Sequence, residues 1–325
     1  MIKRIVLFTS VLLVVLIAFT SCSTKQLGND PEKTPENTDE LNGELFRETI
    51  VYYADDAGYL IPVMRRIPWV EGIAKATLRV MMDTPDQQES LMMMGLRPLL
   101  PEDAEILGMS IKDGVAKVDF NEAVLNCKDA VAETNMVQGV VLTLAGFSTI
   151  DKVQFMFNGK IIDKMPFGTK VGEPISPMDI NVETYDGVMP DGAKVTVYFQ
   201  STSVSQYDYL IPVTRITNAM NATFETALEE LLAGPKDTDN MTIDIPQGTK
   251  LLGLQMTNGV TYINFSKEFS SLAADPNSEA MVLRAIKMVA SHFPEIEQLE
   301  ILVDGKKYVD ATQIDDIPVF ANEYD

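Results

Sequence analysis

Side chains able to do nucleophilic or acid–base chemistry are scarce in this sequence. Its 325 residues include one histidine, His292, and two cysteines, Cys22 and Cys127. A nucleophile needs a base within hydrogen-bond reach, and a zinc site needs several His or Cys ligands. No phosphate-binding, Rossmann or nucleophile-elbow glycine motif is present. We therefore expect no catalytic residue, no cofactor and no metal ion, and we interpret the protein as a non-enzyme.

His292 and Cys127 both have simpler structural interpretations. His292 is expected near the end of a helix, where the macrodipole favours a cation. Cys127 has no soluble partner for a disulfide, and a lone thiol usually packs as a small apolar side chain. We therefore predict a structural role for each.

Two sets of acidic residues could imitate a functional site. Glu225, Glu229 and Glu230 could supply the paired carboxylates of a glycosidase that cleaves the cell wall. Their spacing instead places them opposite an apolar helix stripe, on a solvated face. Asp186 and Asp191 are each followed by glycine but lack the ligand pattern of a calcium loop. Turn residues are the better interpretation, and a wall hydrolase is the weakest functional hypothesis.

The N-terminus carries a targeting signal. A basic start precedes the apolar run Ile5–Phe19, which is shorter than the roughly 20 residues of a spanning helix. We predict a signal peptide over residues 1–21. The small residues Thr20 and Ser21 before Cys22 resemble a bacterial lipobox, although Phe19 stands where leucine is usual. That resemblance implies that Cys22 is the lipid attachment site, on the extracytoplasmic face of the cell membrane. The alternative is a cleaved secretory signal with an incidental cysteine.

Composition describes a globular acidic protein. Apolar residues make up 46%, and the formal net charge of −21 argues against nucleic acid as a partner. Residues 22–45 are polar and charged, which predicts a flexible acidic tether. Residues 313–325 are read as an acidic tail.

Several segments of the first half recur in the second half. The offset is 145 or 146 residues at three matches and 150 at the Leu-Ile-Pro-Val match, so we expect two tandem domains rather than a solenoid. The predicted boundaries are 46–165 and 193–312, joined by a proline-rich linker over 166–192. The matched pairs are Leu60–Val63 with Leu210–Val213, Ile106–Met109 with Leu251–Leu254, Asp113–Val115 with Asn258–Val260, and Phe157–Lys160 with Val303–Lys306.

Each copy predicts the order ββαββαβ. The Leu-Ile-Pro-Val segments read as strands that lie at a sheet edge or begin after the proline, because proline cannot donate a ladder hydrogen bond. Asp113-Gly114 and Asn258-Gly259 predict type I′ hairpins. A mixed sheet packed by two helices makes each copy a two-layer α+β domain. The predicted strands, in the order of the first and second copy, are 50–54, 60–63, 106–111, 115–120 and 153–157, then 194–200, 210–213, 251–256, 260–265 and 299–303.

Apolar stripes mark the helices. The first helix of copy one is expected to end at Thr84-Pro85, and that of copy two at Gly234-Pro235. A second helix follows the hairpin in each copy. The stripes are Ala74, Thr77, Leu78, Met81 and Met82; Val137, Val140, Val141, Leu144 and Phe147; Phe224, Ala227, Leu228, Leu231 and Leu232; and Val282, Ala285, Ile286, Val289 and Phe293.

Exposed methionine and aromatic side chains could form contact sites. Met92-Met93-Met94 is expected in core or semi-buried packing, with an adaptable binding surface as the alternative. Trp69 and Tyr59 flank the edge strand of copy one. They could anchor a partner or be buried under the first helix, and both interpretations stay open.

The order of these elements resembles the tandem GerM domains of sporulation and germination lipoproteins. The resemblance rests on the Leu-Ile-Pro-Val strands, the helix ending at Gly234-Pro235, the hairpins through Phe120 and Phe265, and the closing helix–strand pairs. It covers about residues 46–160 and 194–308. It implies a ring-building-motif-like fold and a non-enzymatic role in supporting an envelope complex.

The sequence therefore predicts a lipid-anchored scaffold. Its expected partners are the membrane, through the N-terminal lipid, and other envelope proteins, and a homo-oligomer is left open. The alternative is a lipoprotein that binds a solute or a cell-wall fragment, which would need a cleft with convergent polar groups between the two copies.

Overall fold

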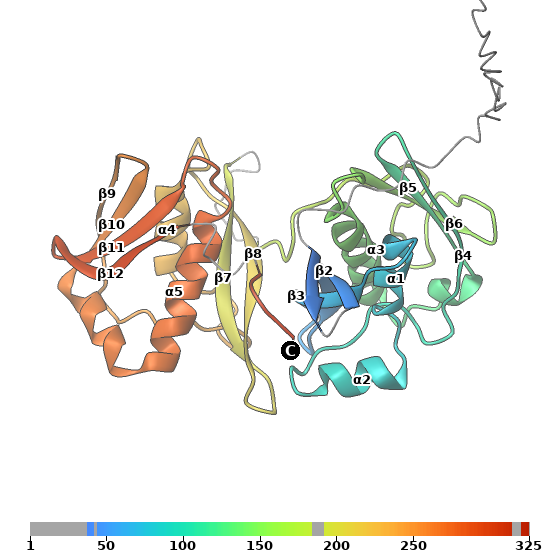
Figure 1. Ribbon diagram of the computed structural model, residues 1–325, viewed down its shortest axis with the longest axis horizontal. Helices are drawn as coiled ribbons and strands as arrows, with labels where there is room; N and C mark the ends of the chain where they lie inside the picture. The colour runs from blue at the N-terminus through green and yellow to red at the C-terminus, as the bar shows by residue number, and fades with distance from the viewer. Residues whose placement is uncertain (1–37, 42–43, 184–191, 314–319, 325) are drawn as a thin grey trace, which may run out of the picture. The chain divides into compact units, whose positions relative to one another are not determined.

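The computed structural model describes residues 38–41, 44–183, 192–313 and 320–324 (Figure 1). Residues 37–325 form one compact unit. The predicted signal peptide and Cys22 lie outside the described residues, as do Asp186 and Asp191. Within the described ranges, no helix has both the length and the apolar character to cross a membrane.

The first repeat contains two small sheets with helices packed against them. Strand β2 carries the predicted strand and extends further in the N-terminal direction. The elements are β1 (Thr38–Leu41), β2 (Glu44–Ala54), β3 (Leu60–Pro68), α1 (Ile73–Arg79), α2 (Pro85–Met92), β4 (Ile106–Lys112), β5 (Val115–Phe120), the 3₁₀ helix η1 (Glu122–Leu125), α3 (Ala130–Ala145) and β6 (Lys152–Phe157).

The second repeat follows the same order with small differences. It lacks a counterpart of α2 among the described residues, and it adds a closing strand, β12. Its elements are β7 (Lys194–Thr202), β8 (Asp208–Ile216), α4 (Phe224–Leu232), β9 (Leu251–Thr257), β10 (Val260–Phe265), the 3₁₀ helix η2 (Lys267–Ala274), α5 (Pro276–Ala290), β11 (Gln298–Val303) and β12 (Lys306–Gln313).

Sheet topology confirms the predicted α+β class. The first repeat has sheets of order β1-β2-β3 and β4-β5-β6, and the second has β7-β8 and β12-β11-β10-β9. Strands β5 and β6 pair in parallel, as do β10 and β11, because α3 and α5 supply the crossover connections. The strands of each repeat are thus divided between two sheets, and the helices bury their apolar stripes against both.

The hairpins form where the turn residues predict them. Asp113 and Gly114 have φ of 50° and 75°, and Asn258 and Gly259 have φ of 55° and 81°. Positive φ at both central positions is the requirement of a type I′ turn. Register then places Ala116, Val118 and Phe120 in the core, and Thr261, Ile263 and Phe265 likewise.

The end of the first helix differs from the prediction. Helix α1 ends at Arg79, and Thr84-Pro85 begins the unexpected helix α2 instead of ending α1. The Thr84 side chain accepts a hydrogen bond from the Gln87 backbone N–H, and Pro85 occupies the first turn. Threonine at the N-cap followed by proline is a helix-start signal.

Described residues within the ranges predicted as tether and tail take part in the fold. Thr38–Leu41 is a strand that pairs antiparallel with Glu44–Arg47, so part of the range assigned to the tether is a β-strand. At the other end, Ala321 and Asn322 are buried, so this part of residues 313–325 is not a free acidic tail.

The predicted linker packs against the first repeat. The Glu133 carboxylate on α3 accepts hydrogen bonds from the Phe167 and Thr169 backbone N–H groups at 2.7 and 2.9 Å. Burial acts to raise the pKa of Glu133, but these backbone donors outweigh it and the pKa is lowered. Ile175 pairs antiparallel with Val153 of β6. The proline-rich stretch thus begins as an extension of the first domain.

Candidate functional site at the junction of the repeats

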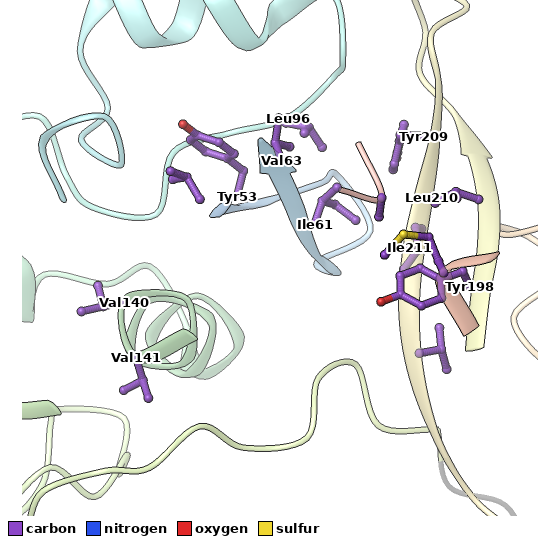
Figure 2. Close-up of a cluster of buried hydrophobic side chains, with 14 of the residues drawn as sticks. Tyr53, Ile61, Val63, Leu96, Val140, Val141, Tyr198, Tyr209, Leu210 and Ile211 are labelled. Carbon is purple, nitrogen blue, oxygen red and sulfur yellow. The ribbon is translucent and has the colours of Figure 1, made fainter. Parts of the chain in front are cut away.

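The repeated Leu-Ile-Pro-Val segments lie against each other at the junction of the two repeats. They form the start of β3 and the middle of β8, each an edge strand as predicted from the internal proline. Figure 2 shows Ile61 and Val63 on one strand and Leu210 and Ile211 on the other, within one cluster of buried side chains. The most evident repeat in the sequence is therefore the surface that joins the two copies.

Two asparagines bridge these strand edges by nearly the same geometry. Asn322 accepts from the Leu210 N–H at 2.7 Å and donates to the carbonyls of Leu210 and Pro62 at 2.8 and 2.9 Å. Asn181 accepts from the Leu60 N–H at 2.9 Å and donates to the carbonyls of Leu60 and Pro212 at 2.8 and 2.7 Å. Each amide satisfies the edges of both repeats, and we call these two residues the asparagine clasps.

The segments that carry the clasps also add backbone pairing. Thr214 on β8 donates to the Ile180 carbonyl and accepts from the Glu183 N–H. Met64 on β3 donates to the Asn322 carbonyl and accepts from the Tyr324 N–H. The linker therefore covers one edge strand and the C-terminal segment covers the other, which removes the exposed edges that would otherwise template aggregation.

The tyrosine before each Leu-Ile-Pro-Val segment reaches across the junction. The Tyr59 hydroxyl donates to Asp237 of the second repeat at 2.6 Å, and the Tyr209 hydroxyl donates to Asp55 of the first repeat at 3.3 Å. Burial raises the pKa of Tyr209 to about 12. The Tyr59 hydrogen bond is the main reason that the pKa of Asp237 is lowered, whereas burial raises that of Asp55. These groups form a polar layer around the apolar contact.

A polar cleft opens beside this layer. Its volume is about 370 Å³, and both repeats contribute walls. Asp55, Asp56 and Asp239 are among the residues that line it, and Arg97 forms an ion pair with Asp56 at 2.8 Å. Residues with hydroxyl side chains also line it, namely Ser201, Thr202, Ser203, Thr238 and Thr242. The arrangement is suited to a ligand that donates hydrogen bonds.

A second pocket lies within the first repeat. It has a volume of about 500 Å³, and its lining includes Arg97, Lys128 and Cys127, apolar residues such as Leu99 and Val131, and the acidic residues Asp55, Asp56, Asp83 and Asp129. Burial raises the pKa of Cys127 to about 11, so its thiol is protonated at neutral pH and unsuited to nucleophilic attack. This agrees with the structural role predicted for it.

His292 follows the end of α5, as the sequence predicts, but its pKa shifts in the direction opposite to the one that the helix macrodipole would cause. Its Nε2 lies 3.0 Å from the Tyr198 hydroxyl. Loss of water contact lowers the pKa of His292. This shift disfavours the cation, and stabilisation of the cation by the helix dipole stays a prediction. His292 does not contact the cleft.

The three predicted glutamates separate into two kinds. Glu225 and Glu229 are exposed, as expected for a solvated helix face. Glu230 instead forms an ion pair with the fully buried Arg215 at 3.2 Å, and Glu183 forms a second one at 2.7 Å. Arg215 also donates to the carbonyls of Glu230 and Gly234 at 2.8 Å. Sequence reasoning missed this buried arginine.

The three methionines of the run differ in burial, and the aromatic residues Trp69 and Tyr59 differ in location. Met94 is in the core, but Met92 and Met93 are exposed, so the expectation of packing is wrong for these two. Trp69 is partly buried against the core. Tyr59 belongs to the junction described above. A tyrosine precedes each repeated segment, Tyr59 and Tyr209, and this shared residue is a sequence signal that could have pointed to the junction.

Comparisons with known proteins agree with this architecture. A family model, Germane, described as sporulation and spore germination, matches residues 50–163 and 196–309. The chain is 29% identical over 276 residues to the spore germination protein GerM of Bacillus subtilis strain 168. The alignment covers 82% of this chain and 74% of that protein.

A solved structure of tandem domains gives the same result. The tandem GerMN domains of the Bacillus subtilis sporulation protein GerM match with a TM-score of 0.70 and 25% identity, over 86% of this chain and all of that one. The first GerMN domain of the same protein, solved alone, is 32% identical over 40% of this chain and 96% of its own, with a TM-score of 0.37. The resemblance to tandem GerM domains predicted from the sequence is confirmed.

Proposed function

The chain belongs to the Germane family of sporulation and spore germination proteins, and from that premise we propose that it is a lipid-anchored interaction protein supporting an envelope complex in sporulation or germination. The observation that carries this proposal is the tandem match over most of the chain, with a TM-score of 0.70. The relative is described as a spore germination protein. Anchoring through Cys22, placement outside the cell membrane and the scaffold role are parts of the proposal.

A non-enzymatic mechanism belongs to the same proposal. The clasps and edge coverings join the two repeats by hydrogen bonds, which suits a protein that presents surfaces to partners. The protonated Cys127 thiol and the His292–Tyr198 contact support structural roles for the two residues best suited to chemistry. The partners we propose are other envelope proteins, with a homo-oligomer left open.

The test combines genetics and fractionation. Deleting the chain from its host should reduce spore formation or germination, and the wild-type chain should restore it. Cys22→Ala should move the protein from the membrane to the soluble fraction without unfolding it, measured by fractionation and circular dichroism. Normal spores and germination after deletion would contradict the role, and membrane retention of the Cys22 variant would contradict the anchor.

A second candidate function is supported by the cleft at the junction. A solute or wall-fragment binder needs convergent polar groups between the copies, and the cleft of about 370 Å³ provides them. Because a ligand that binds only the folded state stabilises it by mass action, wall fragments should then raise the melting temperature. An unchanged melting temperature with saturating fragments would remove this candidate.

A further inference from the structure

Strand β9 has an uncovered edge in the second repeat. It ends the four-stranded sheet β12-β11-β10-β9 (Figure 1), and among the described residues no backbone group pairs with its other side. Elsewhere the chain covers strand edges with its own segments, because the linker pairs with β6 and β8 and the C-terminal segment pairs with β3. An exposed edge strand is a template for pairing with another chain, so β9 is a place where this fold can extend a sheet into a partner.

The uncovered edge is also uncharged. Residues 251–265, which form the hairpin of β9 and β10, contain no Asp, Glu, Lys or Arg, in a chain with 22% charged residues. The equivalent hairpin of the first repeat, formed by β4 and β5, carries Lys112, Asp113, Lys117 and Asp119. Charged side chains are a common protection of edge strands against pairing. The first repeat therefore has this protection at β4, and the second repeat lacks it at β9.

Free backbone groups and apolar side chains occur at the same residues of β9. The hairpin turn has two residues, so Thr257 and Val260 form the first hydrogen-bonded pair, and such pairs alternate along the ladder. The N–H and C=O groups of Leu254 and Met256 therefore point away from β10. Leu254 packs partly against the core, and Met256 is 52% exposed. The free edge thus offers hydrogen bonds and apolar surface together.

Resting on the proposed function for its role in the cell, we propose that β9 pairs antiparallel with β9 of a second copy of this chain, about a two-fold axis beside Gln255. In this register, Leu254 lies opposite Met256 of the second copy. The register that pairs the free N–H and C=O groups is therefore the one that brings the apolar side chains together.

The charge of the hairpin favours a second copy as the occupant. A charged partner would gain no ion pair at residues 251–265, whereas an identical edge is self-complementary there. Two copies that each carry a net charge of −21 repel least where neither presents a charge. The proposed lipid anchor would hold the copies at one membrane surface, and a high effective concentration lets a contact of small area form.

Cysteine cross-linking tests the contact. Gln255→Cys is introduced into the full chain, which is purified in mild detergent, held at about 100 µM to populate a weak contact, and oxidised with copper phenanthroline. The two residues 255 form a non-hydrogen-bonded pair with Cα atoms about 4.5 Å apart, within the range of a disulfide. We expect a disulfide-linked dimer as the main product on a non-reducing gel. The wild-type chain is the control for bonds through Cys22 or Cys127.

Two further cysteines test the register and the strand. In the proposed register, Thr257→Cys places the two residues 257 about 14 Å apart, which is too far for a disulfide. Ser110→Cys occupies the position on β4 that is equivalent to Gln255. We expect each of these variants to give about tenfold less dimer than Gln255→Cys.

A matched pair of lysine substitutions tests the apolar contact. Met256→Lys, at an exposed residue, places a charge opposite Leu254 of the second copy, so it should lower the dimer yield of Gln255→Cys about tenfold. Ile111→Lys, at the equivalent exposed residue of β4, should leave that yield unchanged. Circular dichroism checks the fold of each variant.

The outcomes separate this inference from the proposed function. Monomer alone in Gln255→Cys, equal dimer yields at positions 255, 257 and 110, an unchanged yield with Met256→Lys, or a ladder of larger species in place of the dimer would overturn the proposal. The cross-linking uses the purified chain and is independent of spore formation and membrane fractionation. If the deletion phenotype is present and the dimer is absent, only the pairing through β9 fails.

Discussion

The two repeats hold an equivalent arginine in opposite ways. Arg65 on β3 and Arg215 on β8 both lie over an aromatic ring, of Tyr53 and Phe199 respectively. Arg215 is fully buried and paired with two carboxylates. Arg65 meets neutral groups, and its guanidinium lies 4.3 Å from the ring centre of Tyr324. One position in the fold thus tolerates either an ionic or an aromatic partner, supplied by the segment that covers the strand edge.

The difference between the two arginines shows which residue of each covering segment contacts the strand edge. The linker brings Glu183 to Arg215, and the C-terminal segment brings Tyr324 to Arg65. A buried ion pair is demanding, because removing one partner leaves an uncompensated charge. A cation–π contact contributes less and is more forgiving. We therefore expect the second repeat to depend more on its arginine than the first.

The largest predicted effect is on the free energy of unfolding, and it tests the comparison of Arg215 with Arg65 directly. Arg215→Met should lower the free energy of unfolding by about 3–5 kcal/mol, because it leaves Glu183 buried without its cation. Arg65→Met should lower it by about 1–2 kcal/mol, since Gln87, Ser90 and Tyr324 are uncharged partners. Urea denaturation of both variants measures the difference, with the exposed Arg79→Met as control. Equal losses at the two positions would contradict the ionic and aromatic assignment.

A smaller effect is expected at the clasps. Asn322→Ala removes three hydrogen bonds to buried strand edges and should cost about 2–3 kcal/mol. It should also loosen the coupling of the two repeats, visible as faster hydrogen exchange at Leu210 and Met64. Asn277→Ala, at an exposed position, is the control. If exchange at the junction stays slow, the C-terminal segment is not what secures the first repeat to the second.

The elements of each repeat were predictable because they follow local rules. The Asp-Gly and Asn-Gly turns set the hairpin register, and the apolar stripes set the buried helix faces. The edge position of Leu60–Val63 followed from the missing N–H of Pro62. These features depend on residues close in sequence, so periodicity and turn chemistry suffice to find them.

The junction was less predictable because its partners are far apart in sequence. Asn322 bonds to Pro62 across 260 positions, and no local pattern marks either residue. Asn181 and Asn322 are 141 positions apart (322 − 181), which differs from the offsets of the matched segments, so a comparison of the two copies does not align the clasps. The buried Arg215 was missed for the same reason, as a charged residue inside an apolar strand shows its partners only when the chain folds.

The smallest predicted effect concerns His292, which the first repeat lacks. Desolvation lowers its folded pKa below the unfolded value of about 6.5, so the unfolded chain binds a proton first as the pH falls. Its contribution to stability is therefore complete above pH 6.5 and is lost as the pH falls through that value. Because His292 is an exposed residue, we expect the stability difference between wild type and His292→Gln to change by at most about 0.5 kcal/mol between pH 8 and pH 5. Urea denaturation at both pH values measures it. A difference that grows as the pH falls would mean that the helix dipole stabilises the cation after all.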